Sequence, residues 1–363
     1  MGEILIVLVM SVENRQITAP CTTIETPPLV NERLLVPDSP IVQIYDYFEP
    51  DQTGALFRSL LKDEGIKTVN ICLISGRCGS TYLGHLGGSV GLNSTLAQET
   101  FHELTAKVFA KAFPERDLAV YLRLVIDRCR AGDRFFFQAT PYRLQAAGQL
   151  FGLENILASC DCFSVIFRRN ILSQALSYEE AASTGVWHNR GQDAAQQSRI
   201  TDPRNVLPWL EMINNIEIET QSLLGTFAYQ TYYYEDIASQ PMETLLAYLN
   251  QHDYPVSLDR LQAAFSTKDS PKKLLKPDFA RSYLSCLEEF PWISAILQRR
   301  TNGDLCNQEI ARRIHIERFG EPPESVANAG TQAVNPALPA VENRGVKSLM
   351  THSGSRLRRL FGI

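Results

Sequence analysis

The sequence predicts an α/β fold in which helices cover both faces of a mainly parallel β-sheet. Short apolar runs alternate with longer segments of helical periodicity, and the runs are rich enough in β-branched and aromatic residues to form buried strands. The predicted strands are residues 69–75, 134–139, 162–168 and 228–235. Alternation of strands with helices predicts parallel pairing, because each crossover helix packs on a face of the sheet. At 363 residues and 44% hydrophobic, the chain can bury one large core.

Residues 1–67 are predicted to form an extension that precedes the core. Residues 2–10 are apolar, but they lack a basic start and a cleavage site and are too few to span a bilayer. We expect a strand or a poorly ordered start there. Residues 20–40 are rich in Pro and Thr and predict a loop, whereas residues 54–61 predict a short helix.

The first predicted strand leads into a loop that is suited to binding an anion. The chain there reads Val69-Asn-Ile-Cys-Leu-Ile-Ser-Gly-Arg-Cys-Gly-Ser-Thr81. Gly76 and Gly79 let the backbone approach a ligand, and Arg77 supplies a forked cation. Backbone N–H groups of the loop and of the first helical turn would converge on one point. The Walker A spacing is absent, so we expect phosphate or sulfate binding that needs no metal.

A second strand-to-helix segment, residues 162–177, supports this interpretation. Support is needed because Gly and Ser also occur in such turns for steric reasons alone. Arg168 and Arg169 lie at the carboxyl end of the strand, where open α/β sheets bind their ligands. Ser177 lies about two helical turns beyond Arg169, so its hydroxyl and the guanidinium can approach one anion. The alternative is that the arginines cap a strand and Ser177 is merely a small helix residue.

Helical patterns account for most of the remaining chain. They cover residues 95–112, 117–131, 142–151, 171–184, 206–224, 240–252, 257–266, 278–300 and 306–318. We therefore predict a single domain over residues 68–320. Residues 321–363 are rich in Pro, Ala, Asn and Ser and predict a disordered tail with a short basic amphipathic end at 356–363.

Charge and cysteine usage restrict the classes of function. The net charge of -5 argues against general affinity for nucleic acid. The eight cysteines form no Cys-x-x-Cys pair and no spacing typical of metal ligands. We therefore expect reduced thiols in a cytoplasmic protein and no bound metal.

The two anion-binding segments resemble those of the sulfotransferases that use 3′-phosphoadenosine 5′-phosphosulfate (PAPS). The resemblance is closest to the bacterial group of trehalose 2-sulfotransferase and Nod-factor-type carbohydrate sulfotransferases. Ser75-Gly-Arg-Cys-Gly-Ser-Thr-Tyr-Leu83 is similar to the family's 5′-phosphosulfate loop, and Arg169-Asn-x3-Gln-Ala-x-Ser177 to its 3′-phosphate site. Thr184-Gly-Val-Trp-His188 and Tyr234-Glu-Asp236, the latter predicted to end a strand, follow in the family's order. The resemblance implies the P-loop-like sulfotransferase fold over residues 69 to 300.

This resemblance also implies roles for individual residues. The 5′-phosphosulfate would be bound by Arg77, Cys78, Gly79, Ser80 and Thr81, and the 3′-phosphate by Arg169 and Ser177. Lys273 lies in the lysine-rich stretch 267–276, which would either close over the phosphates or remain a solvated charge run.

Transfer to a hydroxyl requires a base, because an alcohol is protonated at neutral pH. The resemblance implies Glu99 as this base, within Gln98-Glu-Thr-Phe101, and His188 is the second candidate. Arg77 would stabilise the charge that accumulates on the departing phosphate. One departure from the family bears on activity, since Gln138 stands near a position that often carries Lys.

We therefore expect a sulfotransferase that moves the sulfuryl group of PAPS to a hydroxyl of a carbohydrate or glycolipid by in-line attack. Two alternatives remain open: a P-loop-like kinase or transferase that uses a nucleotide with magnesium, and a non-catalytic nucleotide-binding relative. The basic end of the tail predicts weak contact with a membrane surface or, alternatively, a solvated tail. The resemblance is compatible with a homodimer.

Overall fold

A five-stranded sheet with the strand order β2-β3-β1-β4-β5 forms the centre of the protein. The computed structural model describes residues 47–89, 117–184, 202–251 and 277–320, and single positions between 101 and 110 and between 254 and 263. The two-residue strand β2 (Arg130–Ala131) pairs antiparallel with its neighbour β3. The other strands pair in parallel: β1 (Thr68–Ile74), β3 (Arg134–Ala139), β4 (Cys162–Phe167) and β5 (Tyr229–Tyr233). The predicted strands and their parallel pairing are confirmed.

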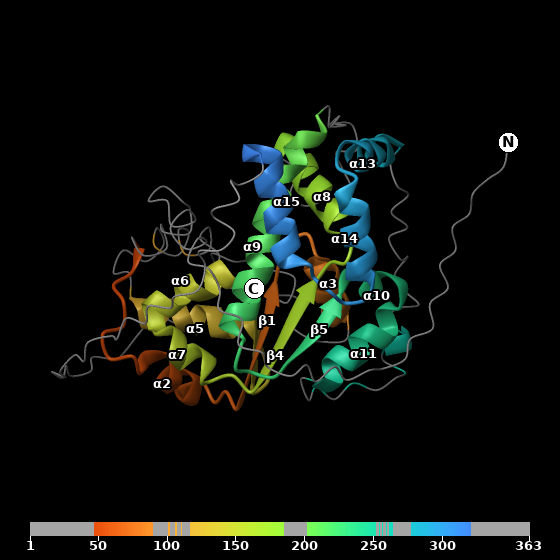
Figure 1. Ribbon diagram of the computed structural model, residues 1–363. Helices are drawn as coiled ribbons and strands as arrows, with labels where there is room; N and C mark the ends of the chain where they lie inside the picture. Colours follow the sequence, from red (N-terminus) through yellow and green to blue (C-terminus); the bar gives the residue numbers. More distant parts are fainter. Residues whose placement is uncertain are drawn as a thin grey trace.

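Helices lie before, between and after the strands in the chain (Figure 1). Before β3 they are α2 (Leu56–Asp63), α3 (Ser80–Ser89) and α5 (Leu118–Cys129). Between β3 and β5 they are α6 (Pro141–Phe151), α7 (Leu153–Leu157), α8 (Ile171–Thr184), the 3₁₀ helix η3 (Pro203–Val206) and α9 (Leu207–Leu223). After β5 they are α10 (Tyr234–Ser239), α11 (Pro241–Gln251), α13 (Pro277–Glu289), α14 (Trp292–Thr301) and α15 (Asn307–Phe319).

Successive residues of the central strand β1 belong to opposite faces of the sheet. Ile71 and Leu73 lie in one apolar cluster with residues of α2, α5, α6 and α7, whereas Cys72 and Ile74 lie in a second cluster with residues of α3, α10 and α11. This alternation follows from the two-residue period of a strand, so a run that is apolar at every position must be covered on both sides. The prediction that helices cover both faces is thereby confirmed.

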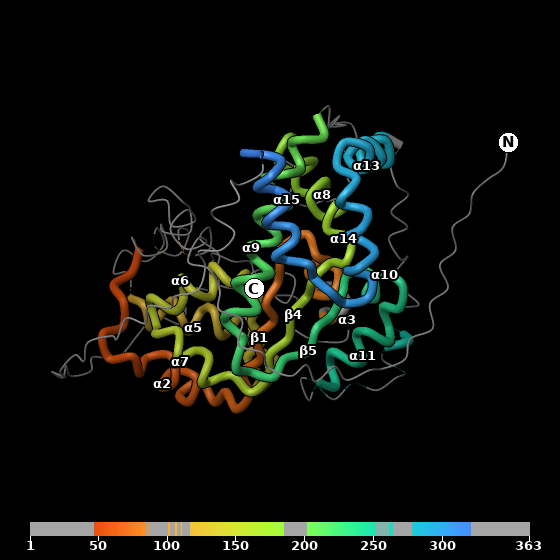
Figure 2. Tube along the Cα trace, in the orientation of Figure 1, coloured from red at the N-terminus to blue at the C-terminus, as the bar shows by residue number. Residues whose placement is uncertain are grey.

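A third apolar cluster lies beyond the sheet and is formed by α8, α9, α13, α14 and α15. Figures 1 and 2 show α8, α13, α14 and α15 grouped at the end of the sheet toward which the strand arrows point. The carboxyl ends of the parallel strands therefore lie between the sheet and this helical layer. Open α/β sheets bind their ligands at this end.

The structure corrects two predicted elements. Strand β5 ends at Tyr233, and Tyr234 already begins α10, so Tyr234-Glu-Asp236 is the first turn of a helix and does not end a strand. The helix predicted over 278–300 is divided into α13 and α14, which are separated by Phe290 and Pro291. Proline lacks an N–H group and clashes with the preceding turn, so the second helix begins after it.

The described part of the predicted extension, residues 47–67, contributes to the main core. Phe57, Leu60 and Leu61 of α2 are buried in the same cluster as Ile71 of the central strand. Among the residues that the structure describes, no helix has the length and hydropathy needed to span a membrane.

Candidate anion-binding site

The loop between β1 and α3 is tightly curved. Gly76, Arg77 and Gly79 have φ angles of 63°, 50° and 85°, in the left-handed region. A Cβ atom on Gly76 would lie 2.0 Å from the hydroxyl oxygen of Tyr178, and one on Gly79 would lie 2.3 Å from the ring of Tyr234. Glycine is therefore required at both positions by the protein's own packing. The left-handed conformation of Arg77 is uncommon for a residue with a side chain and is typical of functional loops.

Side chains of helix α8 hold this loop through hydrogen bonds. The amide of Gln174 donates hydrogen bonds to the hydroxyl of Ser75 at 2.9 Å and to the carbonyl of Gly76 at 2.6 Å. The hydroxyl of Tyr178 donates to the carbonyl of Ser75 at 2.9 Å. Gln174 and Tyr178 are both buried, so the loop has a fixed position relative to the helix.

The two segments predicted to bind anions meet at Arg77 and Ser177. The Nε and Nη2 atoms of Arg77 donate to the Oγ atom of Ser177 at 3.1 and 2.9 Å, although the two residues are 100 positions apart in the chain. Arg77 is partly buried and follows the carboxyl end of β1, and Ser177 is buried on α8. A forked cation and a hydroxyl group therefore lie together at one point, the two kinds of group that a phosphate or sulfate site requires.

Arg169 pairs with a carboxylate. Its Nη1 and Nη2 atoms donate to the two carboxylate oxygens of Asp236 at 2.7 and 2.9 Å. The guanidinium also lies over the ring of Tyr233, 4.1 Å from the ring centre. Burial opposes the charge of Arg169, but the hydrogen bonds and charge of Asp236 outweigh burial and raise its pKa. An incoming phosphate must therefore compete with Asp236 for this guanidinium.

Arg168 is less well compensated. It lies over the ring of Tyr234, 4.4 Å from the ring centre, and donates one long hydrogen bond of 3.4 Å to the carbonyl of Arg77. Its Nε atom has no hydrogen-bond partner among the described residues, and the nearest carboxylate oxygen of Glu235 lies 4.0 Å away. Burial lowers the pKa of Arg168, because removing its charge from water costs free energy. A buried donor without an acceptor favours binding of an anion beside it.

A further cation, Arg143 on the neighbouring helix α6, lies near Tyr178. Burial lowers the pKa of Arg77, and it lowers the pKa of Arg143, in the first turn of α6, to about 10. Both remain charged at neutral pH. Tyr178 interacts electrostatically with both guanidinium groups, so both lie near this tyrosine. The clustering of positive charges in a partly buried position is the main electrostatic feature of this end of the sheet.

Glu235 accepts hydrogen bonds at the amino-terminal end of α8. Its carboxylate accepts hydrogen bonds from the backbone N–H groups of Arg169 and Asn170, both at 3.0 Å. The side chain of Asn170 accepts from the N–H of Ser173 at 2.9 Å. These N–H groups are the ones that a helix amino terminus would otherwise offer to a ligand. In this structure the protein's own side chains use them, so any bound anion relies on the arginines and on the β1–α3 loop.

The remaining predicted residues have different positions. The side chain of Cys78 is fully buried in an apolar cluster, and burial raises the pKa of its thiol. Within the loop, the backbone of Cys78 but not its thiol could contact a ligand. Ser80 begins α3 and is buried, and Thr81 is half-buried. Gln138 is buried on β3. Glu99, His188 and Lys273 lie outside the described residues, so the predicted base and lid have no structural position here.

The sequence reasoning missed several contacts of the site. Arg143 follows β3 in another strand-to-helix turn, after the helix-initiating Pro141, and this repetition of the pattern was an available signal. A buried ion pair between Arg300 and Glu217 contacts the turn that carries Arg169, as described below. Nothing local in the sequence marks that pair, because its members are 83 positions apart.

Comparisons with known proteins add no family assignment. A scan against models of protein families finds no match, and neither does a search of curated proteins or of solved structures. Among the described residues, no group of His, Cys, Asp and Glu side chains is arranged to hold a metal ion.

Proposed function

We propose that the protein is a sulfotransferase that binds PAPS and transfers its sulfuryl group to a hydroxyl of a carbohydrate or glycolipid. The observation that carries this proposal is the pair of hydrogen bonds from Arg77 to Ser177. These bonds join the loop expected to bind the 5′-phosphosulfate to the helix expected to bind the 3′-phosphate. One ligand with phosphoryl groups at both positions would contact both segments.

The chemistry of the site supports this proposal. In sulfuryl transfer, the acceptor oxygen attacks sulfur, the bond between sulfur and the bridging oxygen breaks, and negative charge accumulates on the departing phosphate. Arg77 in the β1–α3 loop and Arg168, which donates to the carbonyl of Arg77, are partly buried cations that would stabilise this charge without moving. The proton of the acceptor hydroxyl passes to a base, for which we propose Glu99, with His188 as the second candidate.

Binding of the 3′-phosphate would involve an exchange of partners. Arg169 forms a forked pair with Asp236 in this structure, and phosphate oxygens offer the same forked geometry. We propose that the 3′-phosphate replaces Asp236 at Arg169, while Ser177 donates its own O–H to the phosphate. Asp236 is partly exposed, so its carboxylate can be released to water.

Titration calorimetry with adenosine 3′,5′-bisphosphate, AMP and ATP in the presence of EDTA tests the proposal. The expected result is binding of the bisphosphate without metal and at least tenfold tighter than AMP. Preference for ATP once magnesium is restored would favour a kinase-like enzyme. Equal affinity for the bisphosphate and AMP would remove the 3′-phosphate site and with it the proposed function.

Catalysis is tested separately with radiolabelled PAPS and a panel of carbohydrate and glycolipid acceptors. The Glu99→Gln variant should bind the bisphosphate normally and lose sulfuryl transfer, because its amide cannot accept the acceptor's proton. Retained turnover in Glu99→Gln would transfer the role of base to His188. Binding of PAPS without transfer to any acceptor would indicate the non-catalytic alternative.

A further inference from the structure

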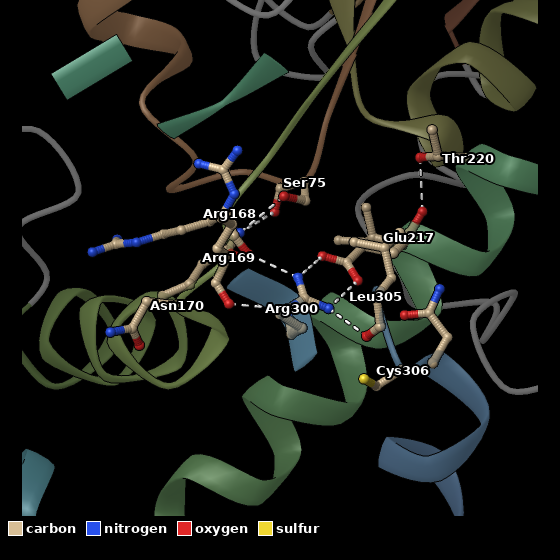
Figure 3. A network of polar contacts seen from close by, with 12 residues as sticks. Ser75, Arg168, Arg169, Asn170, Glu217, Thr220, Arg300, Leu305 and Cys306 are labelled. Atoms are coloured by element: carbon tan, nitrogen blue, oxygen red, sulfur yellow. Dashed lines mark hydrogen bonds and ion pairs between the residues drawn. The ribbon is translucent and has the colours of Figure 1, made fainter. Parts of the chain in front are cut away.

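A fully buried ion pair lies directly behind the turn that carries the site's arginines (Figure 3). Arg300, in the last turn of α14, forms two hydrogen bonds of 2.9 and 2.6 Å with the carboxylate of Glu217 on α9. Neither side chain is accessible to solvent. Burial opposes the charge of Arg300, but Glu217 outweighs burial and raises its pKa. The guanidinium is therefore a permanent cation inside the protein.

The other donors of Arg300 hold backbone carbonyl groups. Its Nε atom donates to the carbonyl of Arg169 at 3.0 Å, and its Nη2 atom donates to the carbonyl of Arg168 at 2.7 Å. Its Nη1 atom donates to the carbonyl of Leu305 at 2.7 Å. An arginine side chain has five N–H donors, and the bonds to Glu217 and to these carbonyls occupy all of them.

The two peptide groups on either side of Arg169 are consequently held at both ends. In the first, the carbonyl of Arg168 accepts from Arg300, and the N–H of Arg169 donates to Glu235. In the second, the carbonyl of Arg169 accepts from Arg300, and the N–H of Asn170 donates to Glu235. Rotation of either peptide plane would break charge-assisted hydrogen bonds on both sides. The Cα atom of Arg169 and the direction of its side chain are fixed as a result.

We infer that Arg300 is a positioning residue for recognition of the 3′-phosphate: it orients the peptide groups from which the Arg168 and Arg169 side chains extend. This inference rests on the proposed function. A hydrophobic pair of similar volume would fill the same space, and buried ion pairs are often no more stabilising than such a replacement. Only a guanidinium can bind one carboxylate and several carbonyls at once, which gives a reason for a charged residue here.

The test compares the ratio of affinities for adenosine 3′,5′-bisphosphate and AMP, measured by calorimetry, in matched variants. Arg300→Lys keeps a positive charge for Glu217, but its ammonium has three donors, which are too few for the carboxylate and all three carbonyls together. Glu217→Gln removes the charge of the carboxylate and leaves the donors of Arg300 in place. Arg299→Lys is the control, because Arg299 is half-exposed and pairs with Asp304 outside the turn.

In folded Arg300→Lys the ratio should fall at least tenfold, with little change in the affinity for AMP. In Glu217→Gln and Arg299→Lys it should stay within threefold of the unmutated protein, even where Glu217→Gln lowers the melting temperature. An unchanged ratio in folded Arg300→Lys would overturn the inference. An equal loss in Glu217→Gln would also overturn it, because general core integrity would then set the ratio.

A second variant covers the case in which Arg300→Lys does not fold. Glu235→Gln, at a partly exposed position, removes the carboxylate that accepts from the N–H groups of the same two peptide groups. It should lower the ratio at least fivefold. An unchanged ratio there would overturn the inference. The unmutated protein distinguishes failure of this inference from failure of the proposed function. If it shows no preference for the bisphosphate, the proposed function fails, whereas a preference that survives Arg300→Lys contradicts only the role of Arg300.

Discussion

At the scale of single residues, the arginines of the site differ in how fully their charge is compensated. Arg169 has a forked carboxylate partner in Asp236, whereas Arg168 has a long bond to a carbonyl and a buried Nε atom without a hydrogen-bond partner among the described residues. Arg77 donates to the neutral hydroxyl of Ser177. Carboxylates also lie near the other two arginines, because Glu235 is 4.0 Å from Arg168 and Glu180 interacts electrostatically with Arg77. Under the proposed function, we expect Arg77 and Arg168 to supply general affinity for an anion and Arg169 to supply selectivity for the 3′-phosphate.

The first prediction concerns Arg169. Arg169→Ala should weaken binding of adenosine 3′,5′-bisphosphate by about 2–4 kcal/mol, because a charge-assisted forked contact with the 3′-phosphate is lost. The affinity for AMP should stay the same, since AMP lacks that phosphate. Calorimetry with both ligands measures the difference. The control is Arg204→Ala, an exposed arginine paired with Glu289, and a loss of bisphosphate affinity in this control would contradict the assignment.

The second prediction concerns the close approach at Gly76. Gly76→Ala combines a strained left-handed backbone with a collision against the hydroxyl of Tyr178, which would break the hydrogen bond to Ser75. Gly132→Ala has the same strain, with φ of 66°, and open space around its Cβ atom. Urea unfolding should show a loss of about 1–2 kcal/mol for Gly132→Ala and a further ~2 kcal/mol for Gly76→Ala. Equal losses would show that Tyr178 yields easily.

At the scale of elements, helix α8 connects the parts of the site. Its side chains hold the β1–α3 loop through Gln174 and Tyr178, and its amino-terminal turn is closed by Glu235 from α10. Tyr178 also stacks on Trp209 of α9, with ring centres 5.4 Å apart and an interplanar angle of 7°. Helix α8 therefore contacts α9, α10 and the loop that would contact the ligand.

The third prediction concerns the closure of α8. Glu235→Ala should lower the free energy of unfolding by about 1–2 kcal/mol, because two N–H groups at the helix start lose a carboxylate acceptor. Glu243→Ala is the control, since Glu243 is an exposed residue in the first turn of α11 and interacts mainly with the helix dipole there. Its expected loss is about 0.5 kcal/mol. Chemical denaturation of both variants measures the difference, and similar losses would argue against a specific cap.

At the scale of the whole molecule, one sheet is enclosed by apolar clusters on its two faces, and a third cluster lies beyond its carboxyl ends. This arrangement buries titratable groups inside the sheet itself. Cys72, on the central strand, is 2% exposed, and burial raises the pKa of its thiol from 9.0 to about 12. The folded state therefore keeps a proton that the unfolded chain releases in alkaline solution.

The fourth prediction follows from this difference in proton binding. Because the pKa of Cys72 is higher in the folded state, its contribution is fully present below pH 9 and is lost as the pH rises from about 9 to about 12. The free energy of unfolding should fall with a slope of up to about 1.4 kcal/mol per pH unit from this thiol. Cys72→Ala should show a shallower slope between pH 9 and 10. Ser164→Ala, at the paired position on β4, removes a side-chain hydrogen bond that lowers the pKa of this thiol, so it should keep or steepen the original slope. Identical slopes in all three proteins would contradict the prediction.

Local sequence signals determined the parallel sheet and most of its helices. The apolar runs of the strands and the helical periodicity between them depend on neighbouring residues alone, so the strand and helix ranges agree closely with β1, β3, β4, β5 and α8. The sequence also predicted a tight loop at Gly76 and Gly79, and it pointed to Arg77, Arg169 and Ser177 as polar residues of one sheet edge.

Only the tertiary structure decided which partners these residues have. Ser177 pairs with Arg77, Arg169 pairs with Asp236, and Arg300 holds the turn between β4 and α8. The start of α10 at Tyr234, which places Glu235 and Asp236 beside the arginines, was also decided there. Hydrogen bonds and ion pairs join groups according to the distances that chain topology creates, and those distances do not depend on the spacing of residues in the sequence. Periodicity therefore predicts elements, whereas packing of α8, α9, α10 and α14 around the carboxyl ends of the strands determines the contacts within the site.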